Sequence, residues 1–317
     1  MVSDLNTFAS AIFANVERVI IGKRAQMELI LVAMLCQGHV LLEDVPGTGK
    51  TMLARSVAAS MGIDFKRLQC TPDLLPNDIV GVHIFLPNES RFEFQAGPVF
   101  TNILLCDEIN RATPRTQSAL LEAMQERQIS LAGETRPLPQ PFLVLATQNP
   151  IEYEGTFPLP EAQLDRFLVR INMGYPELED EREMLRGQRQ GHPVEGLKQV
   201  VDGTVLTALR QAVADVHLDA SLEDYILKIV SRTRAHPDLA LGASPRGSLA
   251  LYKASQALAA LNNRDYVIPD DIKQLIPPVL GHRLILKPEG QLRGRTTARV
   301  LQGVMDGVDI ELDEPTD

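Results

Sequence analysis

A glycine-rich segment between an apolar run and a helix-forming run carries the residues needed to hold phosphate groups. It reads Gly47-Thr48-Gly49-Lys50-Thr51 and follows the apolar residues 40–42. Glycines in such a turn let successive backbone N–H groups converge on phosphate oxygens at a helix N-terminus. Lys50 is then expected to reach the β- and γ-phosphates of a nucleotide, and the Thr51 hydroxyl to ligate Mg²⁺.

One residue of this loop departs from the pattern G-x-x-x-x-G-K-[ST]. The pattern asks for glycine where this chain has Asp44. Asp tolerates a left-handed backbone better than most residues, so the turn can form if its carboxylate points away from the phosphates. A chance Gly-rich loop is the alternative. This segment has the order that the motif requires: a strand, then the loop with its Lys-Thr pair, then a helix. That order favours a nucleotide-binding loop, with Pro46 and Met52 among its binding residues.

Two adjacent acids follow a second apolar run, residues 103–106. Strand alternation points Asp107 and Glu108 in different directions, which suits two roles. We expect Asp107 to hold Mg²⁺ through its water shell, opposite Thr51, and Glu108 to orient and activate an attacking water. An Asp-Glu pair without other motifs is equally consistent with the solvent-exposed end of a strand. Its place downstream of a phosphate loop favours the catalytic interpretation.

Two further polar residues are candidates for contact with the phosphates. Asn149 follows an apolar run, and the carboxyl ends of parallel strands gather at one edge, so it is placed to bond the attacking water or the γ-phosphate. The alternative is a turn residue before Pro150. Arg246 takes the second position of a helix capped by Ser244, where a cation opposes the helix dipole. It is better explained if it faces a phosphate than if it points into water.

The elements that must position these groups follow an α/β pattern. From about residue 38 to 172, short apolar runs alternate with amphipathic stretches, which is typical of a parallel sheet buried on both faces. The expected strands cover residues 39–42, 65–69, 103–106, 142–146 and 168–171. A helical stretch over about residues 5–36, broken near Ile21-Gly22, is expected before them.

Two stretches interrupt this alternation and are predicted to be β-hairpins, with plain surface loops as the alternative. One joins residues 84–86 to 91–94, and the other joins residues 129–131 to 135–138. Both have turn residues between alternating arms.

After residue 176 the pattern changes to helical periodicity with acidic helix starts. We therefore expect an α/β domain over residues 1–176 and a smaller α-helical domain over residues 177–317. Four or five helices are predicted before residue 287, and they include residues 221–233, 246–261 and 270–275. The acidic tail beyond Lys287 is expected to be weakly ordered or to pack on a neighbour.

Composition restricts the classes of function and the compartment. The formal charge of -10 gives no support to a general affinity for nucleic acid or anionic membranes. Cys36, Cys70 and Cys106 form no C-x-x-C pair, and we interpret them as buried thiols in a reducing compartment. No signal-peptide pattern opens the chain and no apolar run is long enough to span a bilayer, so we expect a cytoplasmic protein without membrane insertion.

Five motifs, in order along residues 5–286, resemble those of the MoxR family of AAA+ ATPases. They are residues 41–47 (LLEDVPG), 107–112 (DEINRA), 146–150 (ATQNP), 164–167 (LDRF) and 244–247 (SPRG). The resemblance implies a P-loop NTPase sheet of five parallel strands with helices on both faces, two β-hairpin inserts and an all-α lid. It also implies that Asp44 is the family's own variant of the phosphate loop.

The resemblance assigns further residues by position. Asn149 matches the sensor 1 position and Arg246 the sensor 2 position. Ile21 and Gly22 match the segment near the adenine. Arg166 matches the arginine finger, which family members present to the ATP of the adjacent subunit.

Proteins that the chain resembles hydrolyse ATP with Mg²⁺, form hexameric homo-oligomeric rings and are thought to mature partner complexes as chaperones. They often act with a von Willebrand factor A domain protein, and the resemblance leaves the client unnamed. An arginine in trans is worth about a thousandfold or more in rate, so an isolated subunit is expected to be a poor ATPase.

Two other functions share some of these residues. A DNA-directed AAA+ motor, such as a helicase or clamp loader, would use the same catalytic groups, but Arg91 and Arg136 are the only Lys or Arg residues on the two hairpins. A nucleotide-gated binding module would hold ATP without hydrolysis, which Glu108, Asn149 and Arg166 argue against. The loop at residues 153–155 is a candidate for a central channel, with core packing of Tyr153 as the alternative.

Overall fold

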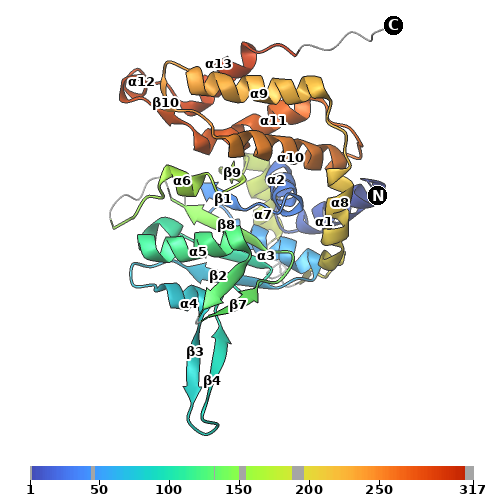
Figure 1. Ribbon diagram of the computed structural model, residues 1–317. Helices are drawn as coiled ribbons and strands as arrows, with labels where there is room; N and C mark the ends of the chain where they lie inside the picture. The colour runs from blue at the N-terminus through green and yellow to red at the C-terminus, as the bar shows by residue number, and fades with distance from the viewer. Residues whose placement is uncertain (1, 44–46, 132, 150–154, 188–195, 311–317) are drawn as a thin grey trace.

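The computed structural model describes residues 2–43, 47–131, 133–149, 155–187 and 196–310. A five-stranded parallel sheet in the order β2-β5-β8-β1-β9 lies at its centre (Figure 1). The strands are β1 (Val40–Glu43), β2 (Phe65–Gln69), β5 (Ile103–Asp107), β8 (Leu143–Gln148) and β9 (Val169–Ile171). The five predicted strands are confirmed, with small differences at their ends. Because all run the same way, their carboxyl ends meet at one edge.

The strands β1, β5 and β8 are buried on both faces of the sheet, whereas the edge strand β2 is mostly exposed. Leu42 and Leu105 belong to a cluster with α1 (Val2–Val16), α2 (Arg24–Leu35) and α3 (Lys50–Met61). Their neighbours Leu41 and Leu104 belong to a second cluster with α5 (Pro114–Glu126). Near-continuous apolar strands are therefore what this architecture requires. The predicted break near Ile21-Gly22 is confirmed, since Gly22 lies between α1 and α2 with a φ of 69°.

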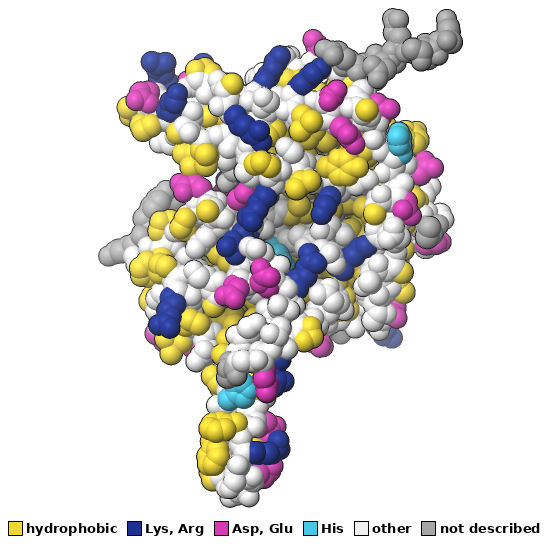
Figure 2. Space-filling view, in the orientation of Figure 1, with side chains coloured by type: hydrophobic (Ala, Val, Ile, Leu, Met, Phe, Trp, Pro, Cys, Tyr) yellow, Lys and Arg dark blue, Asp and Glu magenta, His cyan; other side chains and the backbone are white. Residues whose placement is uncertain are grey.

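Both predicted hairpins are present. After the short α4 (Pro76–Val80), strand β3 (Gly81–Leu86) pairs antiparallel with β4 (Arg91–Ala96), and β6 (Gln128–Leu131) pairs with β7 (Glu134–Pro137). The β3–β4 hairpin projects from the end of the molecule that is farthest from the lid (Figure 1). Hydrophobic side chains line one edge of its tip and charged side chains the other (Figure 2).

A helical lid covers the opposite end of the molecule, and the short α6 (Glu161–Leu164) of the α/β part lies on the side that faces it (Figure 1). Its predicted helices are confirmed. The helices between residues 177 and 286 are α7 (Leu178–Gly187), α8 (Leu206–Ala214), α9 (Ala220–Ala235), α10 (Pro245–Leu261) and α11 (Pro269–Leu280). A small antiparallel pair, β10 (Leu239–Leu241) with β11 (Ile285–Leu286), was not predicted from the sequence. None of the described helices is long and apolar enough to cross a membrane.

The expectation of a weakly ordered tail is wrong for residues 288–310. Two helices, α12 (Pro288–Leu292) and α13 (Thr297–Asp306), follow Lys287. Val300, Leu301 and Val304 are at most 4% exposed and join the core cluster of the lid. Their spacing forms one apolar helix face, a pattern that the acidic end of the chain obscured. Residues 311–317 lie outside the described part.

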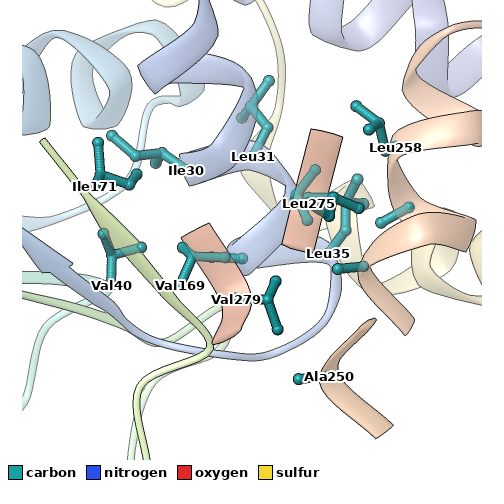
Figure 3. Close-up of a cluster of buried hydrophobic side chains, with 14 of the residues drawn as sticks. Ile30, Leu31, Leu35, Val40, Val169, Ile171, Ala250, Leu258, Leu275 and Val279 are labelled. Carbon is teal, nitrogen blue, oxygen red and sulfur yellow. The ribbon is translucent and has the colours of Figure 1, made fainter. Parts of the chain in front are cut away.

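The sheet face that is covered by α1, α2 and α3 shares one apolar core with the lid. Figure 3 shows Ile30 and Leu31 of α2 in one cluster with Val40 and Val169 of the sheet and Leu275 of α11. Burial of this kind stabilises the fold by about 25 cal/mol for each Å² of apolar surface removed from water. The N-terminal helices therefore connect the lid to the sheet.

Candidate nucleotide-binding site

A cleft of ≈ 420 Å³ opens where the carboxyl ends of β1, β5 and β8 meet. Its described lining residues are Gly47, Thr48, Gly49, Lys50, Thr51, Met52, Arg67, Gln69, Asp107, Glu108, Thr147 and Asn149. Three separate predicted groups, the phosphate loop, the paired acids and Asn149, thus share one cavity. They lie together because the strands that precede them are parallel, and the carboxyl ends of parallel strands meet at one edge of the sheet.

The phosphate loop leads directly into α3, which begins at Lys50. Gly47 and Gly49 have φ values of 86° and 84°, a left-handed backbone that glycine adopts without strain. Chain neighbours aside, no atom of the described residues lies within 4 Å of the place where a Cβ would stand at either glycine. No described side chain caps the start of α3. Its first N–H groups suit an anion such as a phosphate. The predicted loop residues Asp44 and Pro46 lie outside the described residues.

Asp107 is held by groups from the two strands that flank β5. Its Oδ1 accepts a hydrogen bond from Thr147 Oγ at 2.7 Å, and its Oδ2 accepts from Arg67 at 2.7 and 3.1 Å. Thr147 Oγ in turn accepts from the backbone N–H of Glu108 at 2.8 Å. Thr147 therefore fixes the start of the turn that separates the two acids.

Glu108 has a left-handed backbone, with a φ of 56°. The two acids therefore diverge because the chain turns at Glu108, and not through strand alternation alone. Glu108 Oε2 accepts from Gln69 Nε2 at 2.8 Å and from Arg111 at 3.0 Å. Gln69 Oε1 accepts from Arg67 at 2.9 Å, so the donors on β2 are themselves linked. Both carboxylates are thus oriented by β2.

Sequence reasoning missed four residues of this network: Arg67, Gln69, Thr147 and Arg111. The signal for two of them was present, because Arg67 and Gln69 are polar residues two apart on a strand and so share one face. Which face this was depended on the pairing of β2 with β5, in which Gln69 lies opposite Asp107.

The residues in the cleft fit Mg²⁺. The Thr51 hydroxyl and the Asp107 carboxylate line the same cavity, and oxygen ligands of this kind suit that ion. The ion pair with Arg67 shows that Asp107 is placed to hold a positive charge at this point. Thr51 and Asp107 are the residues that would hold the ion.

The other predicted site residues do not line this cleft within the described part of the chain. Arg166 lies beside α5, where it donates a hydrogen bond to the Leu121 carbonyl at 3.1 Å. Arg246 is exposed at the start of α10, and Ser244 caps that helix by accepting from the Arg246 N–H, as predicted. Ile21 lies next to Gly22, which faces the Asp180 carboxylate of α7.

Known proteins resemble this chain over almost its whole length. A family model described as "ATPase family associated with various cellular activities (AAA)" matches residues 39–169, and one described as "AAA lid domain" matches residues 231–304. Protein YeaC of Bacillus subtilis is 50% identical over 97% of this chain and 96% of its own length. The "Chaperone MoxR1" of Mycobacterium tuberculosis is 46% identical over 90% of this chain and 78% of its own length.

The fold is also present among solved structures. A protein from Cytophaga hutchinsonii that is described as a "putative ATPase" superposes with a TM-score of 0.91 at 37% identity, covering 98% of this chain and 97% of its own. Sheet order, phosphate loop, paired acids and lid agree with this relationship along the whole chain. From its fold, its cleft and its relatives together, the chain belongs to the MoxR family of AAA+ ATPases.

Proposed function

We propose that this AAA+ ATPase binds ATP with Mg²⁺ and hydrolyses it within a homo-oligomeric, hexameric ring that remodels or matures partner protein complexes. The observation that carries the proposal is the single cleft in which the phosphate loop, Asp107, Glu108 and Asn149 lie together. The proposal also treats residues 1–176 as the nucleotide-binding unit and residues 177–317 as its lid. Separate family models for the two parts support that division.

The groups in the cleft divide the work of phosphoryl transfer. Backbone N–H groups of the loop and the Lys50 ammonium hold the β- and γ-phosphates. Bound Mg²⁺ would neutralise charge on the same phosphates. Glu108 takes a proton from the attacking water as the water oxygen bonds to the γ-phosphorus, while the bond to the β–γ bridging oxygen breaks and ADP leaves. Asn149 holds that water or the γ-phosphate by a hydrogen bond. Gln69 and Arg111 orient the Glu108 carboxylate for this step.

The two arginines outside the cleft serve different nucleotides in this proposal. Arg246 reaches the γ-phosphate of its own subunit when the lid closes, with Ile21 and Gly22 near the adenine. Arg166 lies beside α5 and serves the site of the next subunit. Its separation from its own cleft supports a role in trans, because a guanidinium stabilises the transferred phosphoryl group only at contact distance.

A protein client is supported by the β3–β4 hairpin. Phe85 and Phe92 are 50% and 68% exposed, and their rings pack 5.2 Å apart on one face of the hairpin. An exposed aromatic pair of this kind is typical of a protein contact site. We propose that the client meets this hairpin, with a von Willebrand factor A domain protein as a candidate partner.

A DNA-directed motor is not favoured by the charges on the hairpins. Arg91 pairs with Glu89 and Glu93, and Arg136 pairs with Glu134 and stacks over Phe94. Each arginine therefore lies beside acidic side chains, which reduce the positive potential at the hairpins. Nucleic-acid binding needs cations that can pair with phosphates.

Replacing Lys50 by alanine tests whether the cleft is the nucleotide site. Loss of one charge-assisted contact to phosphate is expected to weaken ATP binding roughly ten- to hundredfold. Titration of the purified variant with a fluorescent ATP analogue measures this. Lys66→Ala, which changes an exposed lysine on β2, is the matched control and should bind as the unchanged protein does. Unchanged ATP affinity in Lys50→Ala would exclude this cleft as the nucleotide-binding site.

Replacing Arg67 by methionine tests whether its ion pair with Asp107 competes with the metal. The arginine side chain is 50% exposed, so the pair is worth at most about 1 kcal/mol. We expect the Mg²⁺ concentration for half-maximal ATPase activity to fall by roughly two- to fivefold, which follows from that energy. Arg91→Met on the hairpin is the control. A higher Mg²⁺ requirement in Arg67→Met would contradict the idea of competition.

A further inference from the structure

The segment that carries Arg166 is held by a buried arginine of the lid. Arg283 lies in η5 (Gly281–Arg283), and its side chain is 3% exposed. It donates to Asp165 Oδ1 at 2.8 Å, to the Phe167 carbonyl at 2.7 Å and to the Leu168 carbonyl at 3.1 Å. Further bonds go to the Asp165 and Val279 carbonyls. The five N–H groups of a guanidinium are thus all used, and most of them fix the backbone on both sides of Arg166.

The same aspartate connects this segment to the start of α10. Asp165 Oδ2 accepts from Ser244 Oγ at 2.9 Å, and Ser244 Oγ accepts from the Arg246 N–H at 3.2 Å. The Asp165 carboxylate therefore connects the segment that carries Arg166 to the first turn of α10, which carries Arg246. Aligned hydrogen bonds of this kind polarise and strengthen one another.

The Arg166 side chain makes one hydrogen bond within the described residues. Its terminal nitrogen donates to the Leu121 carbonyl, while its buried Nε has no hydrogen-bond partner in the described part of the chain. The position of the guanidinium therefore depends on where its backbone is held. Burial lowers the pKa of Arg283, and the neighbouring Asp165 opposes this, so Arg283 stays charged and bound to its partner.

A hollow beside the Asp165–Ser244 hydrogen bond leaves space for the lid to move relative to α6. A hollow of ≈ 660 Å³ lies between α6 and the lid, and its lining includes Glu161, Asp165, Arg234, Ser244 and Arg283. Figure 1 shows α6 on the side of the α/β part that faces the lid helices. A shift of α10 would be carried to Asp165 through Ser244.

We propose that Arg283 is a positioning residue for the arginine finger. Through Asp165 and Ser244 it fixes the position of Arg166 relative to α10. The lid of one subunit therefore determines where the arginine finger lies that serves the next subunit. The inference depends on the proposed role of Arg166 in trans. The inference adds a physical connection between neighbouring nucleotide sites. Its residues, Arg283, Asp165 and Ser244, contact no nucleotide themselves.

Arg283→Lys keeps the charge but cannot make the forked set of bonds. Because misplacement of a catalytic group by about 1 Å costs on the order of a hundredfold, kcat is expected to fall roughly ten- to hundredfold while the KM for ATP stays within about twofold. Arg264→Lys is the matched control, since Arg264 forms a similar two-bond pair with Asp271 elsewhere in the lid. It should retain the kcat of the unchanged protein.

Mixed rings separate positioning of the finger from damage to the nucleotide site. Glu108→Gln subunits have intact fingers but no base, so mixing them with Arg283→Lys subunits should raise ATP turnover above that of either alone. A fall in kcat that mixing does not reverse, or no fall at all, overturns the inference. Mixtures of Arg166→Ala with Glu108→Gln run in parallel. If these also fail to recover, the role of Arg166 in trans is wrong, and the inference fails with it.

A milder pair of variants covers the case in which Arg283→Lys does not fold. Ser244→Ala removes the bond to Asp165, and Ser244→Thr keeps a hydroxyl for both bonds. We expect Ser244→Ala to lower kcat severalfold and to be rescued by Glu108→Gln subunits, and Ser244→Thr to match the unchanged protein. Equal kcat in both Ser244 variants overturns the inference.

Discussion

Arg166→Ala is expected to lower the ATP turnover of the assembled protein about a thousandfold, the typical contribution of an arginine finger to the rate. ATP affinity should be unchanged, because Arg166 lies beside α5 and does not line the cleft of its own subunit among the described residues. The variant should therefore bind nucleotide as tightly as the unchanged protein while releasing almost no phosphate.

Phosphate release and nucleotide affinity, measured on the same preparation, check this expectation. Arg295→Ala is the control, since Arg295 is more than half exposed and pairs with Asp238 on the lid surface. Size-exclusion chromatography of both variants shows whether assembly is retained. Full turnover by assembled Arg166→Ala would remove it from the catalytic groups, and weakened ATP binding would place it in its own cleft.

Glu108→Gln is expected to lower turnover by roughly a hundred- to ten-thousandfold, the contribution of a general base. Glutamine keeps the size of the side chain and can still meet Gln69 and Arg111, but it cannot take a proton from water. ATP binding should persist, since Lys50 and the loop glycines are untouched. A single-turnover assay on the assembled protein separates loss of chemistry from loss of binding.

The same variant provides a route to the client. A ring that holds ATP without hydrolysing it should retain its bound protein, so the proteins that co-purify with Glu108→Gln but not with Glu108→Gln/Lys50→Ala are candidates. Glu223→Gln, at the start of α9, is the control for charge loss alone. Turnover by Glu108→Gln close to that of the control would show that another group activates the water.

Most of the sheet could be predicted because its signals are local. Apolar runs between turn residues indicated the strands, and runs that are apolar almost throughout follow from burial on both faces. The Ser244 cap and the left-handed Gly47 and Gly49 follow from residue type alone. The β10–β11 pair was missed, because strands this short have no period of their own.

The sequence by itself determined which groups could do chemistry: a glycine loop with Lys50, two acids after a strand, and an asparagine after another. Each of these signals lies within a few residues along the chain, where backbone geometry and residue type are enough. Only the tertiary structure decided which side chains hold them. Arg67 meets Asp107 across 40 residues, and Arg283 meets Asp165 across 118. Strand register and helix packing set such pairs, and no spacing in a single sequence encodes them.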